Sequence, residues 1–145
     1  MTRLWFTILL LVAGLATLNC QSYTTGLQQG SGRADEATAL ANLRAITRAQ
    51  TAYNIGNTGD YATFEQLVSG GYLDERFNSS NPKFYGYVFT MNVRPNSGSG
   101  EASYGLNADP ALKGSGRHFF VDSSDSVIRV NATNQASASD GPLEP

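Results

Sequence analysis

The stretch ADEATALANLRAITRAQTAYN, residues 34–54, decides the fold of this chain. It contains no glycine or proline and is rich in alanine, leucine and arginine. Its apolar residues recur at spacings of three or four: Ala37, Leu40, Leu43, Ile46, Ala49 and Tyr53. Its polar residues lie off this series: Asn42, Arg44, Arg48 and Thr51. Such spacing predicts an amphipathic α-helix with one buried face.

Signals for both helix ends flank this stretch. Asp35 can cap the N-terminus, and the carboxylate of Glu36 suits the positive end of the helix dipole. The segment NIGNTGD, residues 54–60, follows with two glycines that stop the helix. We therefore expect a helix of about 19 residues that starts near Ala34.

A shorter helix is predicted in YATFEQLVSGGYLDERF, residues 61–77. Thr63 and Gln66 have the three-residue spacing of a capping box. A short apolar face follows, made of Phe64, Leu67 and Val68. The glycines at 70 and 71 end it, so the predicted helix is Phe64–Ser69.

After Pro82 the pattern changes to the two-residue period of β-strands. This pattern predicts one strand in FYGYVFTMNV (84–93) and a second in EASYGLNAD (101–109). RHFFVD (117–122) and SVIRVNA (126–132) flank a short SSD turn and predict a hairpin. The order predicts an α+β fold, in which the long helix packs on a three- to four-stranded antiparallel sheet. Residues 34–136 would form this globular domain, and the polar residues 137–145 a C-terminal tail.

Composition excludes several classes of protein. The 145 residues suit one domain, and ten Lys and Arg oppose twelve Asp and Glu. Nucleic-acid binding needs a basic stripe, so we expect no nucleic-acid partner. The single cysteine excludes an internal disulfide and a cysteine-based zinc site. No cofactor and no small-molecule substrate is evident.

The N-terminal segment LWFTILLLVAGLATL, residues 4–18, is apolar or small throughout and follows Arg3. As a helix it would rise about 22 Å, which is less than the roughly 30 Å of a bilayer's hydrocarbon core. A basic start before an apolar run predicts a secretory signal peptide in residues 1–19. A short permanent transmembrane anchor is the alternative.

Cys20 lies just after the apolar run and is our lipidation candidate. Bacterial lipoproteins are cut before a cysteine that then carries lipid, usually with leucine three positions earlier. Here Thr17 holds that position, so the match is imperfect. A cut after Ala16 would leave a free Cys20 thiol, and a later cut would remove the cysteine. Residues 20–33 are polar and glycine-rich, which predicts a flexible tether.

Two further groups of residues are candidates for a catalytic or metal site. His118, the only histidine, lies four residues before Asp122, so both point the same way in a strand. The sequence supplies no nucleophile beside them, which favours a surface histidine. The segment DSSDS, residues 122–126, could suggest calcium, but calcium needs six to eight oxygens and a turn uses the same residues. We therefore expect no catalytic, cofactor or metal site, and no enzyme.

The order of these segments resembles the globular domain of type IV pilins and type II secretion pseudopilins. The matching stretches, which cover roughly residues 34–144, are EATALANLRAITRAQTAYN, YATFEQLVSGGYLDERF, YGYVFTMN, YGLNADPALKGSGRHFFVDSSDSVIRVNA and ASASDGPLE. The first is similar to the second half of the long pilin helix. The others are similar to the region after it, the sheet and the C-terminus.

The N-terminus departs from that family. Pilins open with a basic leader, a glycine cleavage site and Phe-Thr-Leu-Ile-Glu at the start of a continuous apolar helix. Here Phe6, Thr7 and Ile8 give a partial match, without the glycine or the glutamate. Gly30 and Gly32 are also expected to interrupt a continuous helix.

The resemblance implies a non-enzymatic, exported domain in the cell envelope of a bacterium. It would be tethered to a membrane through its N-terminus, in the periplasm or at the cell surface. Its partners would be envelope, pilus or type II secretion proteins, and its role structural or interactive. The alternative is a small ligand- or surface-binding lipoprotein, which would need a concave apolar pocket.

Overall fold

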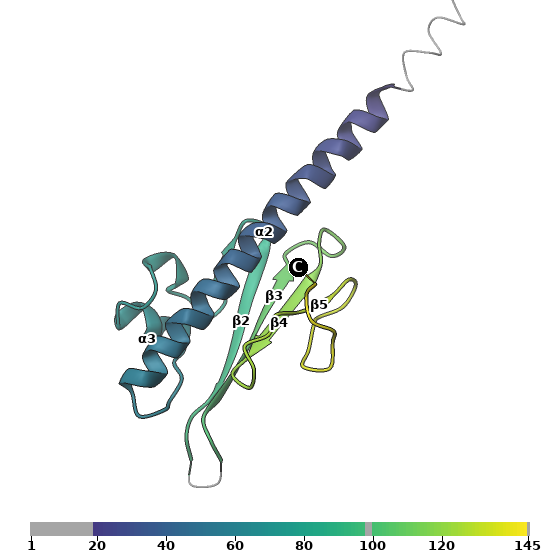
Figure 1. Cartoon of the computed structure of the whole chain (residues 1–145). Coiled ribbons are helices and arrows are strands. Elements are labelled where there is room, and N and C mark those ends of the chain that lie inside the picture. The colour runs from purple at the N-terminus through teal and green to yellow at the C-terminus, as the bar shows by residue number, and fades with distance from the viewer. Residues whose placement is uncertain (1–18, 98–99, 145) are drawn as a thin grey trace, which may run out of the picture. The chain divides into compact units, whose positions relative to one another are not determined.

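The computed structural model of the chain describes residues 19–97 and 100–144 (Figure 1). The helices are α2 (Asn19–Gly56), α3 (Phe64–Ser69) and the 3-10 helix η1 (Glu75–Phe77). The strands are β1 (Lys83–Phe84), β2 (Tyr87–Arg94), β3 (Ser103–Pro110), β4 (His118–Asp122) and β5 (Arg129–Asn131). The chain divides into two compact units between Ala34 and Asp35, and the second carries the sheet. The signal-peptide prediction concerns residues that, apart from Asn19, lie outside the described range.

The strands form a five-stranded antiparallel sheet in the order β1-β2-β3-β4-β5. Each strand pairs with its neighbour in sequence, which short loops permit. The longest pairing joins β2 to β3, from Tyr87 opposite Pro110 to Arg94 opposite Ser103. The predicted α+β class and antiparallel meander are confirmed, with five strands where three or four were expected.

The additional strand comes from a break that the sequence pattern hides. FYGYVFTMNV was read as one strand, but the chain reverses at Tyr85 and Gly86. Their φ angles are 51° and 71°, the positive values of a two-residue type I′ hairpin. A side chain at Gly86 would also lie 3.2 Å from the Asp35 carboxylate. Alternating aromatic residues run through this turn, so the two-residue period continues across it.

Helix α2 begins earlier than predicted. It starts at Asn19, so Asp35 is inside the helix and not its cap. The backbone of residues 20–33, predicted to be a flexible tether, is helical, and the glycines at 30 and 32 do not interrupt it. A glycine costs a helix about 1 kcal/mol relative to alanine, whereas only proline removes a backbone hydrogen bond. No proline occurs in this stretch.

The buried face of α2 is close to the predicted one. Its buried apolar residues are Ala39, Leu43, Ile46 and Ala49, and Leu40 and Tyr53 are half-buried. Two predictions are wrong: Ala37 is exposed and Asn42 is buried. Asn42 is covered because η1 packs nearby, where the Arg76 guanidinium donates to Asn42 Oδ1 at 3.4 Å.

The core lies between this helix face and one face of the sheet (Figure 1). The helix contributes Leu43 and Ile46, and the fully buried strand residues are Phe89, Leu106, Ala108, Phe119 and Val121. Burying each large apolar side chain contributes about 1.5–3 kcal/mol. Helix α3 has the predicted bounds and the predicted capping box between Thr63 and Gln66, which is confirmed.

Gln50 joins α2 to the loop before α3. Its side chain is 0 % exposed. Its Nε2 donates to the Ala62 carbonyl at 2.6 Å, and its Oε1 accepts from the Ala62 N–H at 3.0 Å. One buried amide therefore pairs both backbone groups of a buried residue, as a neighbouring strand would.

The C-terminal residues belong to the folded unit. The Val130 N–H donates to the Gly141 carbonyl at 3.1 Å, and the Leu143 N–H to the Ile128 carbonyl at 2.8 Å. Leu143 also packs against the core. The predicted separate tail is thus wrong for residues 137–144, because backbone bonds to β5 and one apolar side chain hold them in place.

Candidate functional site

The alternation of side chains along the strands gives the sheet two faces. One faces α2 and is apolar. The other, which we call the outer face, is mostly polar. From β2 to β4 its residues are Val88, Thr90, Asn92, Arg94, Ser103, Gly105, Asn107, Asp109, His118, Phe120 and Asp122. Some polar side chains of the outer face make no hydrogen bond to any other described residue. We therefore take this face as the candidate functional surface.

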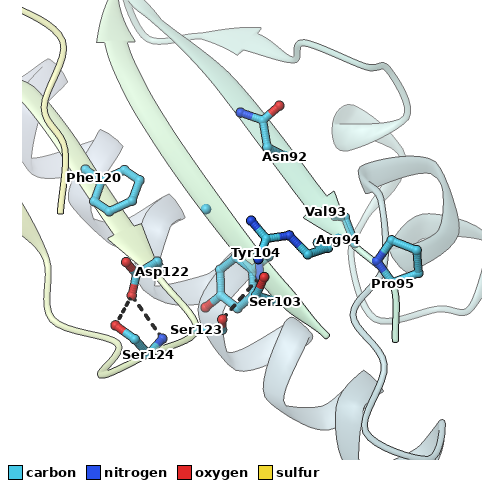
Figure 2. Close-up of a pocket in the computed structure, with 11 residues that line it drawn as sticks. Asn92, Val93, Arg94, Pro95, Ser103, Tyr104, Phe120, Asp122, Ser123 and Ser124 are labelled. Carbon is cyan, nitrogen blue, oxygen red and sulfur yellow. Dashed lines mark hydrogen bonds between the residues drawn. The ribbon is translucent and has the colours of Figure 1, made fainter. Parts of the chain in front are cut away.

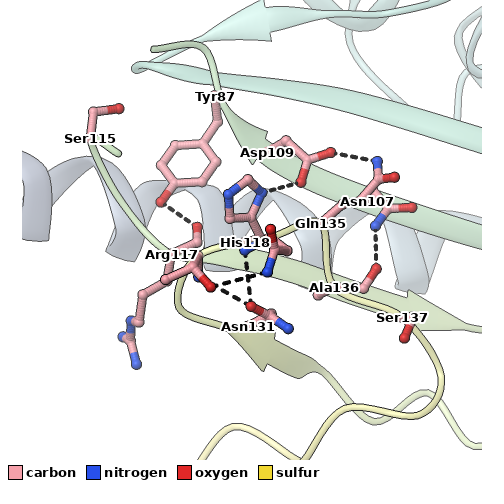
Figure 3. A network of polar contacts seen from close by, with 12 residues as sticks. Tyr87, Asn107, Asp109, Ser115, Arg117, His118, Asn131, Gln135, Ala136 and Ser137 are labelled. Carbon is pink, nitrogen blue, oxygen red and sulfur yellow. Dashed lines mark hydrogen bonds and ion pairs between the residues drawn. The ribbon is translucent and has the colours of Figure 1, made fainter. Parts of the chain in front are cut away.

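One part of the outer face is covered by the residues after β5, 132–144, which we call the C-terminal segment (Figure 3). Asn107 Nδ2 donates to the Ala136 carbonyl at 2.8 Å, and Gln135 Nε2 donates to Asp109 Oδ2 at 2.8 Å. Asn107 is only 8 % exposed, although it lies on the polar side of the sheet. The segment after β5 is therefore fixed across β3 by side-chain hydrogen bonds.

Asp140 fixes a second point of the same segment. Its carboxylate accepts from Asn131 Nδ2 at 2.8 Å and from the N–H and hydroxyl of Ser137. These hydrogen bonds lower the pKa of Asp140 below its ordinary value, and the bond from Asn131 contributes most. The turn between β5 and the C-terminus is thus organised around one ionised carboxylate.

His118 is paired with a residue that sequence reasoning missed. Its Nδ1 lies 2.6 Å from Asp109 Oδ1, and both side chains are largely covered. Asp109 stands opposite His118 on the neighbouring strand, whereas Asp122 is four residues further along β4, about 13 Å at strand spacing. Among the described residues, no hydroxyl or thiol hydrogen-bonds to His118. The pair thus serves as a polar link and lacks a nucleophile.

The other part of the outer face is open and contains a hollow of about 560 Å³ (Figure 2). It lies where β2 leads into the β2–β3 hairpin and β4 into the following turn. The side chains and backbone that line it are those of Asn92, Val93, Arg94, Pro95, Ser103, Tyr104, Gly105, Phe120, Asp122, Ser123 and Ser124. The hollow is shallow, is lined by both apolar and polar surface, and is bordered by the ring of Phe120.

Gly105 is the reason for the hollow. It stands directly between Asn92 on β2 and Asp122 on β4. Because it has no side chain, the middle of the row is bare backbone. A Cβ at Gly105 would lie 3.3 Å from the ring of Phe120, which therefore leans over this position. A glycine inside a predicted strand often marks a place where another group approaches the backbone closely. Gly105 lies inside the predicted strand 101–109, so the sequence contained this signal, although the prediction did not use it.

The DSSDS turn uses its carboxylates locally. Asp122 Oδ1 accepts from the Ser124 N–H at 2.9 Å, and Asp125 binds the Arg129 guanidinium at 2.6 Å. The hydrogen bond from Arg129, followed by that from the Val127 N–H, lowers the pKa of Asp125 to about 2. In residues 19–97 and 100–144, no three His, Cys, Asp or Glu side chains gather as a metal site.

A separate polar contact holds α2 to the loop between β3 and β4. The carboxylate of Glu36 accepts from the Arg117 N–H at 3.1 Å and from its Nε at 3.0 Å. The Tyr87 hydroxyl donates to the Arg117 carbonyl at 2.9 Å. Burial, and then the charge of Glu36, raises the pKa of Tyr87. Glu36 therefore joins α2 to the loop between β3 and β4. The prediction had placed it at the N-terminal end of a helix.

Cys20 lies in the first turn of α2, and its side chain is outside the described part of the chain. Its lipidation stays a prediction. Among the residues that the structure describes, no helix combines the length and the hydropathy that a bilayer crossing needs.

Known proteins give no further guide to the outer face. No family model matches the chain. Neither the curated proteins nor the solved structures that were compared give a match, so the assignment of the site rests on its geometry.

Proposed function

We propose that the protein is a non-enzymatic, exported, pilin-like domain that acts as a structural or interaction component of the bacterial cell envelope. One observation carries the proposal. Helix α2 begins at Asn19, directly after the apolar segment 4–18, and from Asp35 onward it belongs to the unit that carries the antiparallel meander. In sequence, a helix thus follows an apolar segment, and its later part belongs to a helix-on-sheet core.

The helical backbone of residues 19–34 also bears on the resemblance to pilins. The glycines at 30 and 32 were the main objection to a continuous helix, and they lie within α2. The absence of the glycine cleavage site and of the Phe-Thr-Leu-Ile-Glu motif remains a departure. The proposal is therefore a pilin-like domain held at a membrane, without a claim that it enters a filament.

The polar groups beside the C-terminal segment favour a structural role over catalysis. Asp109 and Asn107 hold the C-terminal segment, and His118 is engaged with Asp109. A general base needs a substrate or nucleophile within hydrogen-bond reach. Here the groups with that reach hold the chain's own backbone and side chains.

The test is to express the full chain in a bacterium, fractionate the cells and determine the N-terminus by mass spectrometry. A chain that starts at an acylated Cys20 supports a lipid tether. A retained apolar segment in the membrane fraction supports a pilin-type membrane helix. A start at Thr17 in the soluble periplasm would contradict membrane tethering, and an unprocessed chain in the cytoplasm would contradict the whole proposal.

The Cys20→Ser variant separates the two forms of tethering. If lipid holds the protein, the variant loses the acyl mass and leaves the membrane fraction. If the apolar segment holds it, the variant stays in that fraction. A crosslinking residue at Arg44 or Arg48, both exposed on α2, then tests for an envelope partner. Crosslinks to one protein from these positions, and none from a buried control position, are expected.

A further inference from the structure

We infer that the hollow over Gly105 on the outer face is a binding site for a saccharide. The inference goes beyond the proposed function, since a membrane-held interaction domain needs no such site. It rests on the shape of the hollow, the chemistry of its lining and its place in the middle of the sheet.

The volume suits a small ligand. Binding sites for small molecules commonly enclose about 300–1,000 Å³, and this hollow has about 560 Å³. Gly105 pairs with Asn92 on one neighbouring strand and with Asp122 on the other. Its backbone therefore forms the floor, and Asn92 and Asp122 (both labelled in Figure 2) stand on the two sides. The floor and sides are parts of a paired sheet, so the ligand meets a preformed surface.

The lining joins one aromatic ring to several planar polar groups. Phe120 leans toward the floor, where its ring comes within 3.3 Å of a Cβ position at Gly105. A pyranose offers an apolar face of C–H groups, which an aromatic π-face attracts, and a rim of hydroxyls. Each hydroxyl both donates and accepts, and so pairs with amides, guanidinium groups and carboxylates.

The polar groups beside the ring have hydrogen-bonding capacity that other described residues do not use. Asp122 uses its Oδ1 for Ser124, and among the described residues nothing hydrogen-bonds to its Oδ2. Within the same described ranges, no protein group hydrogen-bonds to the Arg94 guanidinium or the Asn92 amide. An acceptor, a cationic donor and an amide therefore surround one ring, as a polyhydroxylated ligand requires.

Competing ligands fit less well. A nucleotide or polyanion requires several cations, but the hollow offers only Arg94 and places the Asp122 carboxylate in the same site. A peptide that adds a strand requires an open sheet edge, but β3 is paired on both sides. The lining joins apolar surface to polar side chains at 92, 94, 103, 122 and 124, which suits an amphipathic ligand better than a wholly apolar one.

The position of the ring is supported from both sides. Phe120 stands opposite Asn107 on β3 and Arg129 on β5. Asn107 is held by the Ala136 carbonyl, and Arg129 by Asp125. Hydrogen bonds therefore fix the residues that flank the ring on both neighbouring strands.

The experiment is an NMR titration of the ¹⁵N-labelled full chain in detergent micelles with maltotetraose, cellotetraose and chitotetraose. We expect at least one of them to give saturable shifts at the amides of Gly105, Phe120 and Asp122, with millimolar affinity or better. Removal of the ring by Phe120→Ala should weaken that affinity at least tenfold. Gly105→Ala should do the same, because its methyl group occupies the floor.

Two matched variants control for general effects. Tyr85→Asn removes an exposed aromatic ring at the β1–β2 turn, and Gly141→Ala adds a methyl group where nothing lies within 4 Å. Both should bind the saccharide as the parent does. The inference is overturned if none of the three saccharides gives saturable shifts, if the shifts map away from the hollow, or if Phe120→Ala and Gly105→Ala bind as tightly as the controls. None of these outcomes depends on where the protein resides in the cell.

Discussion

Gln50 offers the sharpest test of how this fold is held together. The Gln50→Ala variant leaves the N–H and the carbonyl of Ala62 without partners, in a place where both residues are 0 % exposed. Each unsatisfied buried group costs about 1–3 kcal/mol, and the lost side-chain packing about 1 kcal/mol more. We expect the free energy of unfolding to fall by at least about 3 kcal/mol.

Urea unfolding followed by circular dichroism measures this loss. With a denaturant slope of about 1.5 kcal/mol per molar, the midpoint should fall by at least about 2 M. The matched control is Gln66→Ala, another glutamine whose side chain is exposed and accepts one capping hydrogen bond from Thr63. That control should lose only about 1 kcal/mol.

Gln50→Leu separates packing from hydrogen bonding. Leucine nearly restores the volume but cannot pair with Ala62, so we expect most of the loss to remain. Hydrogen exchange at the Ala62 N–H should also accelerate in both Gln50 variants. If Gln50→Leu is as stable as the parent, or if Gln50→Ala costs no more than Gln66→Ala, the hydrogen-bonding argument fails.

The remaining predictions concern single contacts. Asp125 should titrate near pH 2 by carbon-detected NMR, and Arg129→Gln should return its pKa toward the ordinary 3.8; because the folded pKa lies below the unfolded one, the stability from this contact is present above about pH 4 and is lost as pH falls toward 2. Glu36→Gln should lower the free energy of unfolding by only about 0.5–1 kcal/mol, since Arg117 is 45 % exposed, and a loss above 3 kcal/mol would contradict this. Tyr85→Asn should leave stability unchanged or raise it by up to about 1 kcal/mol, because asparagine tolerates positive φ better than tyrosine; a clear loss in urea unfolding would contradict the assigned turn.

Local sequence signals predicted the parts of the fold whose partners are close in sequence. Helix α3 is the clearest case, because Thr63 and Gln66 cap it across three residues and Gly70 ends it. The apolar face of α2 followed from its period, since a helix brings residues three and four apart together. The two-residue period likewise predicted the segments that contain β2, β3 and β4.

The start of α2 and the break at Tyr85 were missed for opposite reasons. Glycines at 30 and 32 lower helix propensity but leave the hydrogen bonds of the helix possible, so propensity alone gave too short a helix. At Tyr85 and Gly86 the alternating pattern continued through a hairpin. Periodicity says which side a residue faces, and a two-residue turn can preserve it.

Sequence by itself therefore determined the fold class, the order of the elements and the buried faces of the two helices. Tertiary structure alone decided which residues meet: Gln50 with Ala62, His118 with Asp109, and the open row Asn92–Gly105–Asp122. The physical reason is that strand register and the path of the C-terminal segment follow from packing between distant parts of the chain. A shift of one residue in register would turn every outer-face side chain to the core, so the hollow exists only once the whole sheet is assembled.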